Sequence, residues 1–135
     1  MRNIVFDTQA LLALYLGEVG SDKVESYLKD VLERRVKGYL NIINLAEFYY
    51  ILQRKSEETA EEKQRNLRSF GVKVVPVTDH SPLWKQAATI KADHALSLAD
   101  ALAAATALRQ KATLVTGSDI EFEGVKNLKL ERLGG

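Results

Sequence analysis

The stretch Asn3-Ile4-Val5-Phe6-Asp7-Thr8 is a short apolar run that ends in an acid and a hydroxyl residue. A run of this kind, bounded by polar residues, is typical of a buried β-strand. Helical patterns separate it from further β-rich runs, and strands that alternate with helices indicate an α/β fold with a mostly parallel sheet. Because the runs show little polar alternation, we expect helices to cover both faces of that sheet. The further runs are residues 38–42, 72–77, 113–116 and 128–130.

Two of the intervening segments have the apolar spacing of helices that lie against a sheet. Apolar residues recur in them at intervals of three and four, which places these residues on one face of a helix. A third segment, residues 56–70, carries many charges and is predicted to be a peripheral helix with a large solvated face. The two apolar stripes are Val24, Tyr27, Leu28, Val31 and Leu32, and Leu98, Ala101, Leu102, Ala105 and Leu108.

Length and composition limit the class of protein. The chain has 135 residues, of which 46% are hydrophobic and 27% charged, so we expect one globular domain over residues 1–135. It has no cysteine, so a metal would have to be held by oxygen or by His80 and His94. No run reaches the roughly 20 residues of a membrane span, and the apolar run before Asp7 is too short for a signal peptide. We therefore expect a cytoplasmic protein with no membrane partner.

Four acids follow predicted strands or begin predicted helices. Asp7 comes directly after the first strand, and Asp119 comes shortly after the strand at residues 113–116. Glu47 and Asp100 each come three residues after a capping residue, in Asn44-Leu45-Ala46-Glu47 and Ser97-Leu98-Ala99-Asp100. Taken singly, each acid has an ordinary structural explanation: a helix cap for Asp7, a capping box for Glu47 and Asp100, and a turn for Asp119.

A parallel sheet brings these four acids to one place. The carboxyl ends of its strands share one edge, which is where ligands bind in open α/β sheets. Carboxylates close together would repel one another unless a cation neutralised them. Oxygen ligands suit Mg²⁺ or Mn²⁺, and a water bound to such an ion could serve as a nucleophile. One shared metal site accounts for the four acids better than four independent caps and turns do.

Four motifs, in this order along the chain, resemble the PIN-domain family, particularly the VapC-like toxins of type II toxin–antitoxin pairs and their archaeal relatives. The resemblance covers nearly the whole chain and implies a three-layer α/β/α sandwich with a mostly parallel central sheet. It also implies an Mg²⁺- or Mn²⁺-dependent endonuclease that cleaves RNA, usually as a homodimer and, for a toxin, with an antitoxin protein as partner. The motifs are Ile4-Val5-Phe6-Asp7-Thr8, Asn44-Leu45-Ala46-Glu47, Leu96-Ser97-Leu98-Ala99-Asp100-Ala101, and Leu114-Val115-Thr116-Gly117-Ser118-Asp119 with Phe122.

The resemblance also assigns site residues. The acids that match the family's catalytic, metal-binding quartet are Asp7, Glu47, Asp100 and Asp119, and Thr8 and Thr116 match hydroxyl positions beside them.

The last motif departs from the pattern of many relatives. Asp119 follows Thr116 by three residues rather than two, and Glu121 stands just before Phe122. Either carboxylate could be the fourth ligand, and the other would then be a supporting group, as we expect Ser118 to be. We favour Asp119 as the ligand.

An acidic pocket that receives RNA needs basic residues near it to offset repulsion from the phosphates. We consider Arg54, Lys55 and Arg109 as RNA contacts, together with the basic residues at 34, 35, 37 and 111. The alternative for each is a solvated helix end that favours cations. The aromatic and apolar run Tyr49-Tyr50-Ile51-Leu52 is either dimer surface or ordinary core.

Other function classes fit the sequence less well. Haloacid-dehalogenase-like phosphatases need a second Asp two residues after the first, where this chain has Gln9, and receiver domains need a lysine where it has Thr116-Gly117-Ser118. A non-catalytic PIN-fold module that binds RNA or protein would be marked by the loss of acids, and none is missing. We expect His80 and His94 to be structural.

Overall fold

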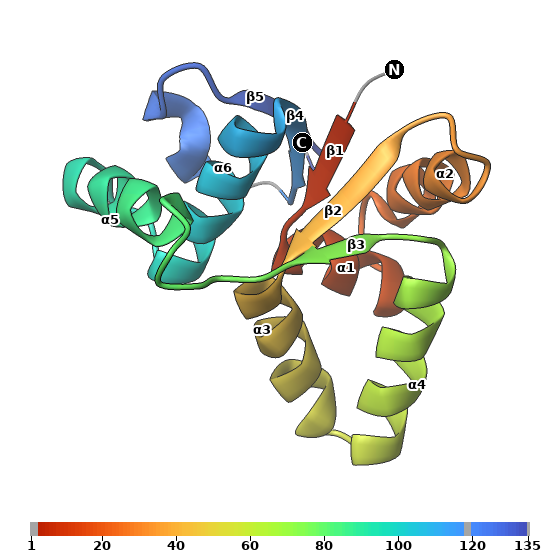
Figure 1. The fold of residues 1–135 in the computed structure, drawn as a ribbon. Coiled ribbons are helices and arrows are strands. Elements are labelled where there is room, and N and C mark those ends of the chain that lie inside the picture. The colour runs from red at the N-terminus through yellow and green to blue at the C-terminus, as the bar shows by residue number, and fades with distance from the viewer. Residues whose placement is uncertain (1–2, 118–119, 135) are drawn as a thin grey trace.

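The computed structural model describes residues 3–117 and 120–134, and one parallel sheet organises them (Figure 1). The strand order across this part of the chain is β3-β2-β1-β4-β5, and every neighbouring pair is parallel. The predicted parallel sheet is therefore confirmed. The strands are β1 (Asn3–Phe6), β2 (Lys37–Asn41), β3 (Lys73–Val75), β4 (Ala112–Thr116) and β5 (Lys129–Arg132).

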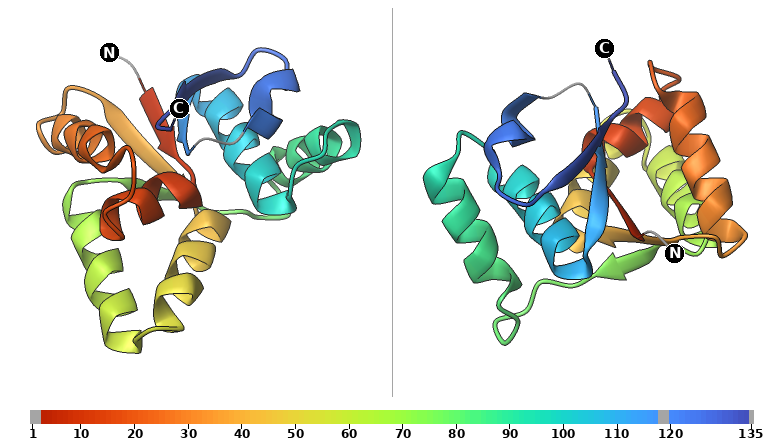
Figure 2. Two further views of the ribbon diagram at one scale, coloured as in Figure 1. Left: turned by 180° about the vertical axis from the view of Figure 1, so that it is seen from behind. Right: turned by 90° about the horizontal axis from the view of Figure 1, so that it is seen from above.

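The helices form layers on both sides of the sheet. Figure 2 shows α5 and α6 on one side and α1 and α2 on the other, while α3 continues from the carboxyl end of β2 and pairs with α4, which leads back to the start of β3. This arrangement confirms the expected three-layer α/β/α sandwich. The bounds are α1 (Thr8–Tyr15), α2 (Ser21–Leu32), α3 (Ile42–Gln53), α4 (Glu57–Ser69), α5 (Leu83–Asp93), α6 (Leu98–Gln110) and the 3₁₀ helix η1 (Ile120–Gly124).

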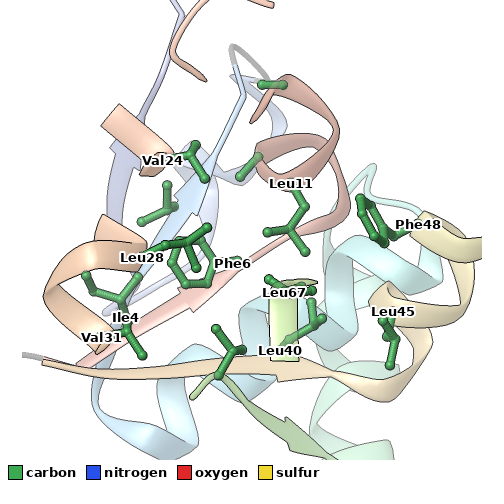
Figure 3. Packing of buried hydrophobic residues seen from close by; sticks show 14 of the residues in the cluster. Ile4, Phe6, Leu11, Val24, Leu28, Val31, Leu40, Leu45, Phe48 and Leu67 are labelled. Atoms are coloured by element: carbon green, nitrogen blue, oxygen red, sulfur yellow. The ribbon is translucent and has the colours of Figure 1, made fainter. Parts of the chain in front are cut away.

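Alternate residues of the central strands supply two separate cores. Ile4 and Phe6 point into the core beneath α1 to α4, which Figure 3 shows together with Leu40 and Leu28. Val5 lies between them in sequence and belongs to the opposite core, beneath α5 and α6. Because successive side chains of a strand point to opposite faces, three consecutive apolar residues require a sheet that is covered on both sides.

Helix α6 can lie close to both the sheet and α5 because its buried face is made of alanine. Its residues Ala101, Ala103, Ala104, Ala105 and Ala107 are buried, and α6 packs against α5, β1, β2 and β4.

None of the helices in the described part of the chain is long and apolar enough to cross a membrane.

Three sequence predictions about these elements were wrong in detail. Leu98 is 55% exposed and Leu32 is 54% exposed, although both were assigned to apolar stripes. Each is a terminal residue of its helix, beyond the part that faces the sheet. The strand predicted at residues 72–77 is shorter, because Pro76 has no N–H to donate to the ladder and β3 ends at Val75.

Candidate functional site

Asp7 is buried at the carboxyl end of β1, where it performs the predicted capping role. Asp7 is only 2% exposed, and its Oδ1 accepts a hydrogen bond from the Ala10 N–H at 2.8 Å. Its Oδ2 accepts a hydrogen bond from the hydroxyl of Thr116, at the end of β4. Both carboxylate oxygens are thus fixed by neighbours on different strands and helices, which compensates part of the cost of burying a charge.

Asn44 joins the beginnings of three helices at this edge. It lies in the first turn of α3, and its backbone oxygen accepts a hydrogen bond from the Thr8 hydroxyl of α1 at 3.1 Å. Its Nδ2 donates to the backbone oxygen of Ala99, in the first turn of α6, at 3.2 Å. The starts of α1, α3 and α6 therefore meet around one buried asparagine (Figure 1).

Three of the predicted acids stand next to the residues that Asn44 joins. Asp7 precedes Thr8, Asp100 follows Ala99, and Glu47 lies one helical turn after Asn44. Glu47 and Asp100 are half-buried and so remain partly accessible to solvent. The exposed N–H groups and dipole of a helix N-terminus favour negative charge, so three converging helix starts are a suitable place for carboxylates and for anionic ligands.

The capping prediction for α3 was wrong, and that for α6 was right in part. Helix α3 begins at Ile42 with Asn41 as its cap, because the Asn41 side chain accepts a hydrogen bond from the Ile43 N–H at 2.8 Å. Asn44 is therefore inside the helix and free for the contacts described above. At α6 the Ser97 hydroxyl oxygen accepts from the Asp100 N–H at 3.1 Å, which is the predicted serine cap.

Two buried residues beside the site were not identified from the sequence. The Nδ2 of Asn41 donates to the Thr106 hydroxyl oxygen at 3.0 Å, and this hydroxyl in turn donates to the Leu102 carbonyl at 2.7 Å. These bonds connect the end of β2 to the middle of α6. The signal for Asn41 was a polar residue at the end of a buried apolar run, whereas Thr106 is one polar residue among alanines in the sequence.

The remaining residues of the last motif are placed only in part. Gly117 packs so closely on the first turn of α1 that a Cβ there would lie 2.9 Å from the Gln9 Oε1. Ser118 and Asp119 lie outside the described residues. Glu121 is exposed within η1.

The donor set is chemically suited to a hard cation, although the described residues do not complete a site. Asp7, Glu47 and Asp100 offer only carboxylate oxygens, which are the ligands that Mg²⁺ and Mn²⁺ prefer. Within residues 3–117 and 120–134 there is no group of three or more acidic or histidine side chains spaced to hold a metal ion. The buried Oδ1 of Asn44 also has no hydrogen-bond partner there. A metal at this edge would thus need further ligands, such as Asp119 or water.

The residues that the sequence suggested as RNA contacts, Arg54, Lys55 and Arg109, lie away from this edge. Arg54 and Lys55 follow the far end of α3, where the Arg54 guanidinium lies 4.9 Å from the centre of the Tyr50 ring. Arg109 is in the last turn of α6, whose 13 residues span roughly 20 Å from the start near Asp100. His80 is highly exposed, and His94 is the predicted end residue of α5.

Residues 4–128 match the family model for the PIN domain. No curated protein sequence matches the chain.

Solved structures share the fold over almost the whole length. VapBC2 from Rickettsia felis, bound to a DNA fragment from its promoter, has a TM-score of 0.74 and 22% identity, with 96% of this chain and 98% of that chain covered. A toxin–antitoxin complex from Klebsiella pneumoniae has a TM-score of 0.72 and 17% identity, with 93% and 94% covered. DNA-bound VapBC from Salmonella typhimurium has a TM-score of 0.70 and 16% identity, with 98% and 99% covered. At these identities the likeness establishes the fold, and the family match over residues 4–128 establishes that this chain belongs to the PIN domain family.

Proposed function

We propose that the chain is an Mg²⁺- or Mn²⁺-dependent endoribonuclease whose metal is held at the carboxyl edge by Asp7, Glu47, Asp100 and Asp119. The observation that carries this proposal is the junction of α1, α3 and α6 at Asn44, because it brings acids from three distant parts of the sequence to one edge. Asp119 is included on the sequence motif alone. Membership of the PIN domain family agrees with this class of activity.

Charge balance supports a cation at this edge. A carboxylate as buried as Asp7 is costly unless it is neutralised, and further acids on the adjoining helix starts add negative charge. When bound, a divalent ion lowers the pKa of a coordinated water and neutralises charge that develops on a scissile phosphate. Oxygen ligands alone suffice for this chemistry, and the chain has no cysteine that could serve as a covalent nucleophile.

The protein's own groups would orient the acids. The Thr116 hydroxyl and the Ala10 N–H hold the two oxygens of Asp7, so this carboxylate has one orientation before any ligand arrives. Asp100 and Glu47 are only half-buried, which would leave them accessible to a divalent ion and the water that it binds. We propose direct in-line attack by water, without a covalent intermediate.

The proposal also includes two protein partners, an antitoxin and a second copy of the chain. The structures with TM-scores above 0.7 include toxin–antitoxin complexes, which supports an antitoxin protein as partner of a cytoplasmic, single-domain toxin. Apolar groups on α3 support a homodimer or antitoxin contact, because Ile43 is 40% exposed and Tyr50 is 43% exposed.

Cleavage of mixed-sequence RNA tests the proposal directly. Wild-type protein is compared with Asp7→Asn and Asp100→Asn in the presence of Mg²⁺ or Mn²⁺. Each change removes one anionic ligand but keeps the size of the side chain. At position 7, which caps α1, Asn is also a good helix cap, so the fold should remain. We expect each variant to cleave at least about a hundredfold more slowly, as the loss of a metal ligand is worth several kcal/mol of transition-state stabilisation.

Asp93→Asn is the matched control, because Asp93 is an exposed acid at the end of α5. It should cleave like wild type. Equal activity in wild type, Asp7→Asn and Asp100→Asn would reject the assigned site. RNA binding without cleavage by the wild type, with either metal, would instead favour a non-catalytic PIN-fold module.

A further inference from the structure

Lysines mark the beginnings of the strands, at the edge of the sheet opposite to the acids. Lys37, Lys73 and Lys129 are the first residues of β2, β3 and β5, and Lys111 immediately precedes β4. We call these four residues the lysine row. Because the strands are parallel, their beginnings share one edge, so the lysine row crosses the sheet from β3 to β5.

The strand register keeps the lysine row close to a line. Lys37 is level with Asn3, and Asn3 is level with Ala112, the residue after Lys111. Lys73 is level with Tyr39, and Lys129 is level with Thr113, so the outer lysines are displaced by only one or two residues. Four strand spacings of about 4.8 Å separate β3 from β5, which makes the row roughly 19 Å long.

The lysine row has no acidic partners within the part of the chain that the structure describes. All four lysines are exposed, and none forms an ion pair with a described residue. The acids just before Lys37 and just after Lys129 are already engaged: Asp30 and Glu33 with Arg35, and Glu131 with Lys23. The positive charge of this edge is therefore available to an external anion.

Two hollows lie along the lysine row, one on each side of β1. The first has a volume of about 350 Å³ and contains Arg34, Lys37 and Lys73. The second has a volume of about 560 Å³ and contains Lys111, Lys126 and Lys129. Each hollow thus offers three cations around a concave surface, which suits a chain of negative charges better than a single ion.

We propose that the amino edge of the sheet binds the phosphate backbone of RNA along the lysine row. Lysine binds phosphate as a compact point charge, and such contacts position a nucleic acid without reading its sequence. An acidic protein is the less suitable partner, because protein interfaces are depleted in lysine and are centred on apolar anchors. Among the described residues, none of the exposed large hydrophobic side chains lines either hollow.

The choice of RNA rests on the proposed function, but its test does not require cleavage. Binding of a fluorescein-labelled, mixed-sequence, 20-nucleotide single-stranded RNA is measured by anisotropy in EDTA, over a series of salt concentrations. Lys37→Gln/Lys129→Gln removes one cation from each hollow. Lys85→Gln/Lys91→Gln is the matched control, because it removes two exposed lysines of α5.

We expect Lys37→Gln/Lys129→Gln to weaken RNA binding about tenfold near 0.1 M salt. The slope of log Kd against log salt should fall by about 1.4, since each lost phosphate contact on a single strand removes about 0.7. The control pair should change affinity by less than about twofold, because neither Lys85 nor Lys91 lines either hollow.

Equal weakening by both pairs would overturn the proposal, because net charge alone would then explain binding. Unchanged affinity and slope in Lys37→Gln/Lys129→Gln would also overturn it. Displacement of the RNA by an equal concentration of poly-L-glutamate would replace RNA with an acidic protein as the partner. Failure of the proposed function is seen separately, as absence of metal-dependent cleavage by the wild type.

Discussion

The two edges of the sheet differ in charge, in burial and in how their side chains are hydrogen-bonded. At the carboxyl edge, Asp7 is buried and hydrogen-bonded, and Asn44 joins the surrounding helix starts. At the amino edge, the lysine row is exposed and has no ion-pair partner among the described residues. A net charge of only +1 conceals this separation. In a parallel sheet, a residue's position before or after a strand therefore determines the edge of the sheet at which it lies.

The largest expected effect is loss of stability in Asp7→Ala. This change removes the cap of α1 and leaves the buried Thr116 hydroxyl without its acceptor. We expect unfolding to become easier by about 2–4 kcal/mol, from the cap and the unsatisfied hydroxyl together. At the opposite edge, Lys37→Gln should change stability by less than about 0.5 kcal/mol, as is usual for surface substitutions.

Urea unfolding followed by circular dichroism measures both changes. Similar midpoints for Asp7→Ala and Lys37→Gln would contradict the prediction, because the buried hydrogen bonds of Asp7 would then contribute nothing measurable to the free energy of unfolding.

Asn44→Ala should show whether the junction of helix starts matters for the site. It removes the side-chain hydrogen bonds from Nδ2 to the Ala99 carbonyl at 3.2 Å and to the Thr8 hydroxyl at 3.5 Å, whereas the bond from that hydroxyl to the Asn44 backbone remains. We expect a loss of about 1–3 kcal/mol together with slower RNA cleavage. Thr106→Val is the matched control, because it removes buried hydrogen bonds of α6 that do not involve the acids. A comparable fall in cleavage rate in Thr106→Val would mean that the effect is general loss of stability.

The fourth acid of the carboxyl edge can be identified by comparing Asp119→Asn with Glu121→Gln. We expect Asp119→Asn to lower the cleavage rate at least about tenfold more, because we assign Asp119 as a metal ligand and Glu121 as a supporting group. Initial rates at saturating Mn²⁺ are the measurement. The reverse order of rates would transfer the assignment to Glu121.

The smallest expected effect is a pH dependence in the α3–α4 pair. The Tyr49 hydroxyl donates to Glu61 at 2.9 Å, and this bond, helped by Gln64, lowers the pKa of Glu61. A lowered folded-state pKa stabilises the protein above the ordinary glutamate pKa, and this contribution is lost as the pH falls through the lowered value. Tyr49→Phe should therefore be less stable than wild type near neutral pH and equally stable in acid.

Urea midpoints at several pH values test this prediction. A difference between wild type and Tyr49→Phe that is as large in acid as at neutral pH would contradict it. Of the two tyrosines that the sequence left open as dimer surface or core, Tyr49 contacts α4, whereas Tyr50 is 43% exposed.

The sequence was sufficient for the fold because its strands carry local signals. Ile4-Val5-Phe6 could be assigned to a sheet covered on both sides from its unbroken apolar character. The placement of Asn44 could not, because an asparagine before a helix and one inside its first turn look alike in sequence. The contacts that Asn44 makes with Thr8 and Ala99 depend on three segments that come together only in the folded chain.

From the sequence the candidate site could be proposed as a set of residues, but its geometry could not be predicted. The expectation that Asp7, Glu47 and Asp100 share one edge followed from the parallel arrangement of the strands, which the alternation of strand and helix patterns indicates. The position of Arg109 did not follow, because distance from the acids depends on the length and direction of α6. Ser118 and Asp119 lie outside the described residues, and their roles stay predictions.

Anomalous diffraction from crystals soaked in Mn²⁺ tests the central claim most directly. We predict an anomalous peak at the carboxyl edge, with oxygens of Asp7 and Asp100 about 2.1 to 2.3 Å away, and its absence in Asp100→Asn crystals. A peak at other residues, or the same peak in Asp100→Asn, would contradict the proposal that acids gathered around Asn44 hold the catalytic metal.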